Sequence, residues 1–248
     1  DLDDLRLYNR ALSAAEVQAL YDAAPPIPDQ VEGLAMWLDA ADIDGDGEAD
    51  TLADGAAVSL WRDKSGNDRD ANQSDPNAAF NYRVGTPSTM PGLVLDGSND
   101  YMEILDANMS AAHIFAVATL IPGGAGSAIL LSRKDAKLSI RRYNLDAKIS
   151  SGGVEDFSFN DGETRVDGAS TLNFSYNTYH VLSVRKGSQS PSNSYDVLEL
   201  GVNSAYPNRH WKGEIVEILI YDRALSTEEI DRIQAYLGEK WGVTIDSQ

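Results

Sequence analysis

The segment that decides the fold is EIVEILIYDRALSTEEIDRIQAYLGEKW, residues 214–241. Its run 215–220 is apolar apart from Glu217, which is typical of a central strand that is covered on both faces. Ser226 and Glu229 then form a capping box, the signature of a helix start. The apolar positions that follow have helical spacing: Ile230, Ile233, Leu237 and Trp241. The segment therefore predicts a central strand that runs into a terminal helix, which covers its outer side.

A second copy of the same signature stands near the start of the chain. Residues 7–17, LYNRALSAAEV, repeat residues 220–230, IYDRALSTEEI, and Ser13 with Glu16 repeats the capping box. We therefore expect a tandem array, of which this chain is a part. The expected divisions are the strand-and-helix tail of a preceding repeat at 1–24, a Pro-rich linker at 25–32, and one complete domain at 33–248.

The composition excludes several classes of protein. The chain has 248 residues, of which 42% are hydrophobic, enough for a sizeable core. It has no cysteine, which excludes disulfides and thiolate zinc sites. A formal net charge of −19 repels nucleic acid and anionic membranes at long range, and no apolar run approaches the length of a membrane span. We expect neither a nucleic-acid partner nor membrane insertion.

The rest of the domain consists of short strand-like runs separated by turn residues. Runs such as 101–105, 114–121 and 180–185 recur along the chain, and only the last segment has a helical pattern. Many short strands with one terminal helix indicate an all-β sandwich. The sequence therefore predicts two antiparallel sheets with a short C-terminal helix.

Four motifs give the chain a resemblance to a known family. They are LAMWLDA at 34–40, VSLWRDKSGN at 58–67, LDGSNDY at 95–101 and IYDRALS at 220–226. Together they resemble bacterial laminin-G-like domains of the concanavalin A-like lectin/glucanase group. The resemblance implies a jelly-roll sandwich in a large secreted or cell-surface protein. Members of that family often accompany polysaccharide-degrading enzymes or form parts of adhesins; many bind calcium and some bind glycans.

An acidic loop predicts a metal site. The stretch DIDGDGEAD, residues 42–50, alternates carboxylates with small residues, and Gly47 stands where an EF-hand-like loop turns sharply. The expected ligands are Asp42, Asp44, Asp46, Glu48, Asp50 and Asp54. Asp39 is an alternative to Asp54 because Ala53 occupies the position of the usual bidentate glutamate. We expect calcium in a structural role; a ligand-bridging role and a solvated loop without metal are the alternatives.

The sequence offers no known catalytic motif. The Glu-x-Asp-x-x-Glu strand motif of glucanases with this fold is absent, and Glu214 and Glu217, three apart on one strand, are expected to face opposite sides. The histidines have no partner at metal-ligand spacing, and no Gly-x-Ser-x-Gly elbow occurs. We therefore expect no enzymatic activity.

Aromatic residues beside polar ones suggest where a glycan would bind. Sugar sites usually combine an aromatic platform with hydrogen-bonding side chains. The candidates are Tyr82, Arg83, Tyr206, Asn208, Arg209 and Trp211. Trp211 fits the core and the rim equally well, whereas the other tryptophans are expected in the core.

Three functions remain open from the sequence. We favour a non-catalytic, calcium-stabilised, lectin-like module that binds a polysaccharide or a cell-surface glycan. The alternative is a structural or adhesive spacer that contacts neighbouring repeat domains in the same chain. A glycan-degrading enzyme of the same fold is a more distant alternative.

Overall fold

The computed structural model describes most of the chain. The described residues are 8–14, 16, 28–48, 50–84, 90–134, 139–142, 149–151, 162–185 and 196–246. Most of the expected tail at 1–24 and part of the expected linker at 25–32 lie outside them. None of the helices in these ranges is long and apolar enough to cross a membrane.

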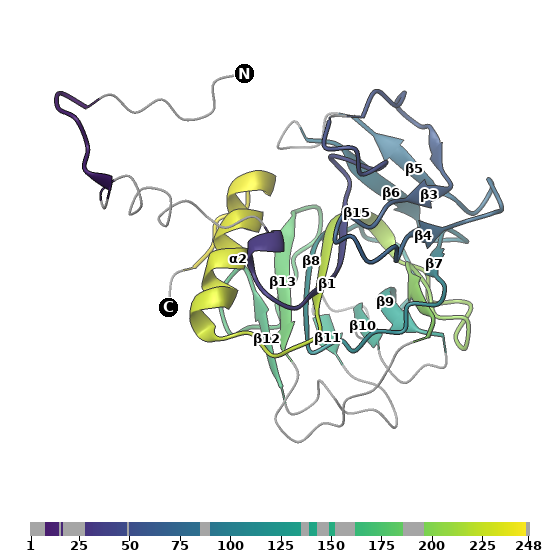
Figure 1. The fold of residues 1–248 in the computed structure, drawn as a ribbon. Helices are drawn as coiled ribbons and strands as arrows, with labels where there is room; N and C mark the ends of the chain where they lie inside the picture. The colour runs from purple at the N-terminus through teal and green to yellow at the C-terminus, as the bar shows by residue number, and fades with distance from the viewer. Residues whose placement is uncertain are drawn as a thin grey trace.

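Two antiparallel sheets form the body of the protein (Figure 1). The larger sheet has the order β12-β13-β8-β15-β6-β5-β2, and β1 also pairs with β15. Its strands are β1 (Leu34–Asp39), β2 (Ala57–Val58), β5 (Phe80–Arg83), β6 (Gly92–Asp96), β8 (His113–Leu120), β12 (Glu163–Val166), β13 (His180–Arg185) and β15 (Lys212–Tyr221). The expected two-sheet antiparallel sandwich is therefore confirmed.

The smaller sheet has the order β11-β10-β9-β14-β7-β4-β3. Its strands are β3 (Leu60–Trp61), β4 (Ala71–Asn72), β7 (Met102–Ile104), β9 (Ile129–Arg133), β10 (Ser139–Arg142), β11 (Ile149–Ser151) and β14 (Leu198–Leu200). Apolar side chains of both sheets form one continuous core, which includes Trp61 and Trp211. A short 3-10 helix, η1 (Pro28–Gln30), precedes β1.

Strand β15 is the centre of the larger sheet. It pairs with β8 along almost its whole length, with β6 over Lys212–Ile215 and with β1 over Glu217–Tyr221. All its residues after Lys212 are buried, as the apolar run predicted. The strand is covered on both faces because the core lies on one side and the terminal helix on the other.

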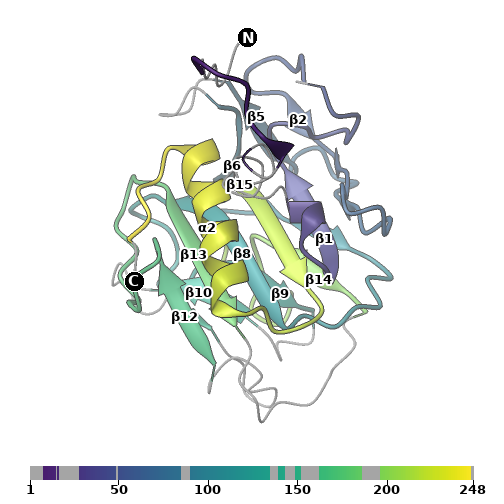
Figure 2. The same ribbon diagram turned by 60° about the vertical axis from the view of Figure 1, so that its left-hand side comes forward.

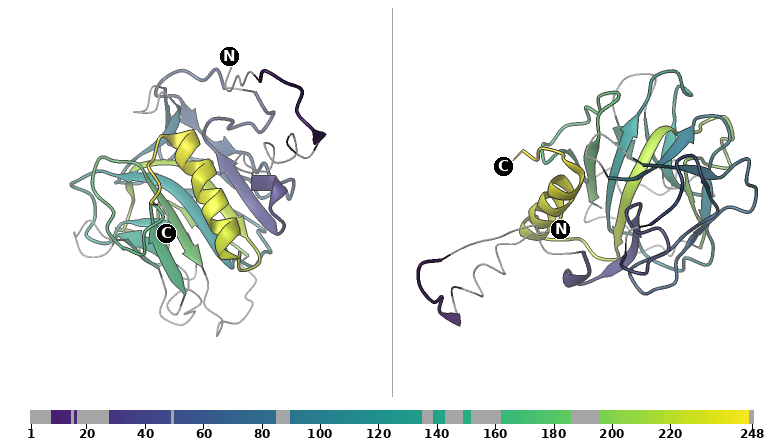
Figure 3. Two further views of the ribbon diagram at one scale, coloured as in Figure 1. Left: turned by 90° about the vertical axis from the view of Figure 1, so that its left-hand side faces the viewer. Right: turned by 90° about the horizontal axis from the view of Figure 1, so that it is seen from above.

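Helix α2 (Thr227–Trp241) lies against the outer face of the larger sheet (Figures 2 and 3). The predicted capping box is present: the Ser226 side chain accepts from the Glu229 N–H, and the Glu229 side chain accepts from the Ser226 N–H. Gly242 ends the helix in the left-handed conformation, at φ 68°. The apolar stripe Ile230, Ile233, Leu237 and Trp241 is buried, as expected.

The N-terminal copy of the signature makes the same local contacts. Arg10 pairs with Glu16, and Ser13 and Glu16 exchange the two capping-box hydrogen bonds. Arg223 pairs with Glu229 in the same way ahead of α2. The two copies therefore share local structure, and the division into repeats remains a prediction.

Candidate functional site

The acidic loop brings three carboxylates together directly after β1. One carboxylate oxygen from each of Asp42, Asp44 and Asp46 lies within 4.8 Å of the others. The loop curls because side chains bind its own backbone: the Gly47 N–H donates to Asp42 Oδ2 at 3.1 Å, and the Glu48 N–H donates to Asp46 Oδ1 at 2.8 Å. Gly47 has φ 87°, which favours a residue without a Cβ.

Asp42 is the buried member of the cluster. Its side chain is buried, with 4% of the residue exposed, and its Oδ1 has no hydrogen-bond partner among the described residues. Its Oδ2 pairs with Lys64 Nζ at 2.6 Å. An unpartnered buried carboxylate oxygen is costly, and a hard divalent cation would satisfy it. Three carboxylates are a fitting part of the six to eight oxygen ligands that calcium takes.

The other predicted ligands lie at different distances from this centre. Asp50 Oδ2 accepts from the Ile43 N–H at 2.6 Å, at the edge of the cluster. Burial raises the pKa of Asp50, and the carboxylates of Asp44, Asp42 and Asp46 raise it further. The Glu48 side chain is exposed. Asp54 does not join the cluster, because its Oδ1 accepts from the Val84 N–H beyond β5 at 3.1 Å.

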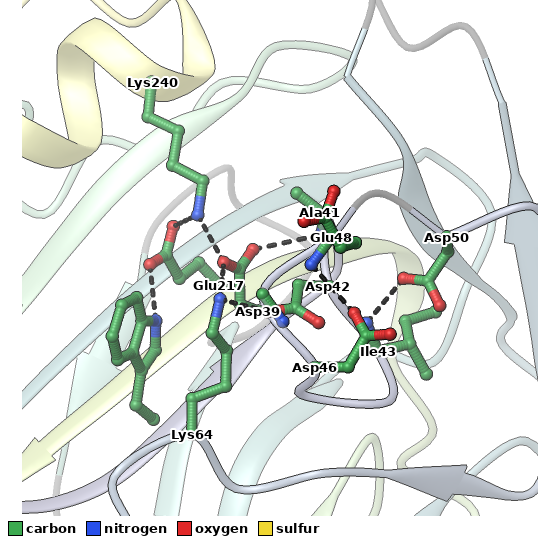
Figure 4. Close-up of polar contacts among 12 residues, drawn as sticks. Asp39, Ala41, Asp42, Ile43, Asp46, Glu48, Asp50, Lys64, Glu217 and Lys240 are labelled. Carbon is green, nitrogen blue, oxygen red and sulfur yellow. Dashed lines mark hydrogen bonds and ion pairs between the residues drawn. The ribbon is translucent and has the colours of Figure 1, made fainter.

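A buried ionic network lies behind the loop, and sequence reasoning missed it. Lys64 Nζ contacts Asp39 Oδ2 at 3.0 Å as well as Asp42, and Lys240 Nζ from α2 contacts the same Asp39 oxygen at 2.7 Å (Figure 4). Lys240 also contacts Glu217 Oε2 at 3.0 Å. Asp39, the alternative ligand, therefore already has two cationic partners. This network of ion pairs thus connects the acidic loop with β1, β15 and α2.

Glu217 is the centre of that network. It is 0% exposed and accepts from Trp37 Nε1 at 2.8 Å, Trp241 Nε1 at 2.5 Å and the Tyr236 hydroxyl at 3.0 Å. Burial raises its pKa, which Lys240 opposes. Desolvation lowers the pKa of Lys64, but Asp39 and Asp42 outweigh it and leave that pKa above its ordinary value. A single glutamate in an apolar strand was the signal for this network.

The structure corrects the expected placement of two glutamates. Val216 forms a β-bulge, so that Glu214 pairs with Thr119 of β8 and Glu217 pairs with Val117. Residues two apart on a strand point to the same face, and Glu214 and Glu217 therefore lie on the same face of the sheet. The expectation that they face opposite sides assumed a regular strand.

The predicted glycan residues divide into two groups. Tyr82 is only 3% exposed and Trp211 is 0% exposed, with its Nε1 donating to the Thr119 carbonyl at 2.9 Å. Both rings belong to the core and offer no platform to a ligand. Arg83 pairs with buried Glu214, to which the Tyr179 hydroxyl also donates.

The second group remains accessible in the loop before β15. The Arg209 guanidinium lies 4.2 Å from the centre of the Tyr206 ring, in a cation–π contact. Asn208 is exposed between them, whereas Tyr206 and Arg209 are half-buried. This Tyr–Asn–Arg surface keeps the aromatic and polar groups that a sugar site uses.

A polar pocket at the start of β1 was not expected from the sequence. Its volume is about 340 Å³, and its polar lining comes from separate loops. The polar residues are Asn67, Arg69, Asn108, Ser110 and Asp222. The Arg69 side chain is fixed by the carbonyls of Ala35, at 2.5 Å, and Ala107, at 2.6 Å. No short motif signals such a pocket, because the sandwich alone brings these loops together.

Comparison with known proteins shows the fold. No family model and no curated protein sequence matches the chain. A Trypanosoma rangeli sialidase in complex with the inhibitor DANA matches at 16% identity and a TM-score of 0.50, over 89% of this chain and 36% of that chain. Another structure of that sialidase matches at 19% identity, a TM-score of 0.47, and 94% and 38% coverage. This chain therefore spans about a third of the sialidase.

A third solved structure matches over nearly its whole length. Domain 4 of AbnA, a GH43 extracellular arabinanase from Geobacillus stearothermophilus, in complex with arabinotriose, matches at 15% identity and a TM-score of 0.46. The match covers 73% of this chain and 99% of that domain.

The match to the sialidase with bound inhibitor corrects the expectation of no enzymatic activity. A solved chain that shares the fold is a sialidase, an enzyme that acts on carbohydrate. The expectation rested on missing motifs, and a missing motif excludes only the catalytic geometry that the motif encodes. Side chains from separate elements can also meet in the folded protein without forming a recognisable sequence motif.

Proposed function

We propose that residues 33–248 form a calcium-stabilised, carbohydrate-binding domain of the laminin-G-like type, in a large secreted or cell-surface protein. The observation that carries the calcium part is Asp42 Oδ1, a buried oxygen without a partner that lies beside the carboxylates of Asp44 and Asp46. Bound calcium would hold the long connection between β1 and β2 and would cancel the repulsion among its aspartates.

Two surfaces support carbohydrate as the ligand. The Tyr206–Asn208–Arg209 surface combines an aromatic ring with hydrogen-bonding groups, and the pocket at β1 combines donors with the carboxylate of Asp222. Hydroxyl-rich ligands need donors and acceptors together, and the net charge of −19 disfavours polyanions. Neutral glycans fit both surfaces best.

The repeated signature supports neighbouring repeat domains as further partners. Arg10 and Glu16 reproduce the contacts of Arg223 and Glu229, which close the domain ahead of α2. An array of such domains would suit an adhesive surface protein. Small-angle scattering of a longer segment of the parent chain, compared with this domain alone, tests whether adjacent repeats contact one another.

Calorimetric titration of EDTA-treated protein with calcium tests the metal. We expect saturable heat and a rise in the free energy of unfolding of about 2.7 kcal/mol at a calcium concentration 100 times Kd. Asp44→Asn removes an exposed ligand: it should weaken calcium binding and slightly stabilise the metal-free protein by relieving repulsion. Asp68→Asn, an exposed aspartate outside the loop, is the control. No heat with the parent protein, or equal effects of the two variants, would end the calcium proposal.

A glycan array probed with and without calcium tests the ligand. We expect binding of neutral glycans that falls on Tyr206→Ala or Asp222→Asn, and the affected variant identifies the surface used. The bound glycans are also incubated with the protein and assayed for released reducing sugar. Absence of glycan binding under either condition would contradict the carbohydrate proposal and leave calcium binding to be judged by calorimetry.

A further inference from the structure

Three side chains beside the end of β12 form a chain of hydrogen bonds. The Ser175 hydroxyl lies 2.8 Å from His180 Nε2, and His180 Nδ1 lies 2.5 Å from Asp167 Oδ2. Asp167 follows β12, Ser175 lies in the loop before β13, and His180 is the first residue of β13. A serine, a histidine and a carboxylate connected in this order have the geometry of an activated nucleophile.

The hydrogen bonds fix the tautomer of the imidazole. An ionised carboxylate only accepts hydrogen bonds, so the proton between Asp167 and His180 belongs to Nδ1. With this tautomer, Nε2 carries a lone pair that can accept from the Ser175 hydroxyl. His180 is therefore oriented as a general base toward Ser175, and Asp167 holds it in that orientation.

The base and its carboxylate are held rigidly. Asp167 Oδ1 accepts from the Val181 N–H at 2.8 Å, and the Asp167 N–H donates to the Val181 carbonyl at 2.9 Å. The Phe174 ring packs against His180, with 4.7 Å between the ring centres. His180 is buried, whereas Ser175 is exposed at the molecular surface. The arrangement thus has a buried, fixed base and a nucleophile that a substrate can reach.

A second serine–histidine pair in the same sheet provides a contrast. His113 Nε2 lies 2.8 Å from the Ser183 hydroxyl, but both residues are buried and His113 Nδ1 has no partner among the described residues. Burial lowers the pKa of His113 to about 3. This pair has neither a carboxylate nor access to solvent, and its role is packing.

We infer that Ser175, His180 and Asp167 form an acyl-transfer site that hydrolyses small carboxylic esters, such as acyl groups on a carbohydrate hydroxyl. Ser175 Oγ attacks the ester carbonyl carbon while its proton passes to His180 Nε2. The ester C–O bond then breaks, and the proton passes from Nε2 to the leaving alcohol oxygen. Water adds to the acyl-serine by the same route, which releases the carboxylic acid and restores the serine.

The backbone offers a group for the developing oxyanion. The Ser175 N–H donates to no backbone carbonyl among the described residues, and it lies beside the attacking oxygen. The loop then turns through Asn177, which has φ 59°, a left-handed conformation that asparagine tolerates. Donated to the carbonyl oxygen, this N–H would stabilise the negative charge that develops during attack.

Labelling with a fluorophosphonate, followed by peptide mass spectrometry, tests the nucleophile. We expect one adduct, on Ser175, and none on Ser183. Hydrolysis of p-nitrophenyl acetate should fall by about 100-fold or more in Ser175→Ala. Ser183→Ala, the matched control, should keep the parent rate. Folded protein that carries no adduct on Ser175, or a Ser175→Ala variant that hydrolyses the ester at the parent rate, would overturn the inference.

Asp167→Asn tests the positioning residue. We expect slower hydrolysis and a displaced pH–rate profile, because the amide no longer fixes the Nδ1–H tautomer. Melting temperatures of the variants separate this effect from a loss of folding. A parent-like rate and pH profile in folded Asp167→Asn would show that the carboxylate takes no part.

Discussion

Lys240→Met is the sharpest test of the buried network between α2 and the sheet. Lys240 Nζ lies 2.7 Å from Asp39 Oδ2 and 3.0 Å from Glu217 Oε2, and methionine keeps the aliphatic part of the side chain. In the variant Asp39 still contacts Lys64, whereas Glu217 keeps only neutral donors. The substitution therefore leaves a fully buried carboxylate without a cation.

The loss of stability in Lys240→Met depends on how deeply each partner of Lys240 is buried. Removing one member of a buried ion pair costs about 3–5 kcal/mol, because the other charge stays buried. The Lys240 side chain is 15% exposed and Asp39 retains Lys64, so we expect the lower end, about 3 kcal/mol. At about 2–4 °C per kcal/mol for a chain of this size, the melting temperature should fall by roughly 6–12 °C.

The assay is urea unfolding at a series of pH values, with Lys134→Met as control. Lys134 pairs with Glu103 at 2.6 Å, but its side chain is 51% exposed, so its loss should cost less than about 1 kcal/mol. Burial raises the pKa of Glu217 above its ordinary 4.5, so native protein binds more protons than unfolded protein between 4.5 and that raised pKa. The Lys240→Met deficit should therefore be largest at high pH and shrink as pH falls toward 4.5.

Two results would refute this reasoning. If Lys240→Met and Lys134→Met lose the same stability at pH 7, burial does not govern the strength of the pair. If the Lys240→Met deficit is constant from pH 4.5 to pH 8, the charge of Glu217 is not its origin. Addition of Glu217→Gln to Lys240→Met should recover part of the loss, since it removes the uncompensated charge.

Two further predictions concern the local geometry of the fold. Arg223 and the capping box lower the pKa of Glu229 from 4.5 to about 2. The stability that the ionised Glu229 contributes is therefore fully present above pH 4.5 and is lost as pH falls toward 2. Glu229→Gln should lower stability by about 1 kcal/mol at pH 7, and its melting curve should coincide with the parent's near pH 2. In urea unfolding, Gly213→Ala should lower stability more than Gly66→Ala. The new Cβ at position 213 would lie 2.2 Å from the Thr119 carbonyl oxygen, whereas a Cβ at position 66 would meet open space. Equal losses of stability in the two variants would contradict the packing at Gly213.

Local patterns predicted the central strand and the terminal helix. The run 215–220 and the capping box at Ser226 and Glu229 depend on neighbours within a few residues, and the structure contains the strand and the helix that they predicted. The acidic loop was visible for the same reason, since its carboxylates are close in sequence and converge when the loop curls. Asp54 was misplaced because a hydrogen bond to distant Val84 holds it.

The sequence did not predict the pocket at β1. Its lining comes from the starts and ends of several strands, and the sequence gives no distance between them. Tyr82 faces inward because it alternates with exposed Asn81 along β5, and Trp211, for which the sequence left core and rim open, lies in the core directly before β15. Exposure is a property of packing, and composition alone does not give it.

The sequence by itself determined the strand that forms the centre of the larger sheet, the helix that covers it and the curled acidic loop, because each depends on hydrogen bonds and periodicity over a few residues. Tertiary structure alone decided that Lys240 would meet Glu217 and Asp39, and that Ser175, His180 and Asp167 would meet at the end of β12. The bulge at Val216 likewise decided which glutamates share a face. Sheet pairing and register make these contacts, and residues far apart in sequence carry no local mark of them.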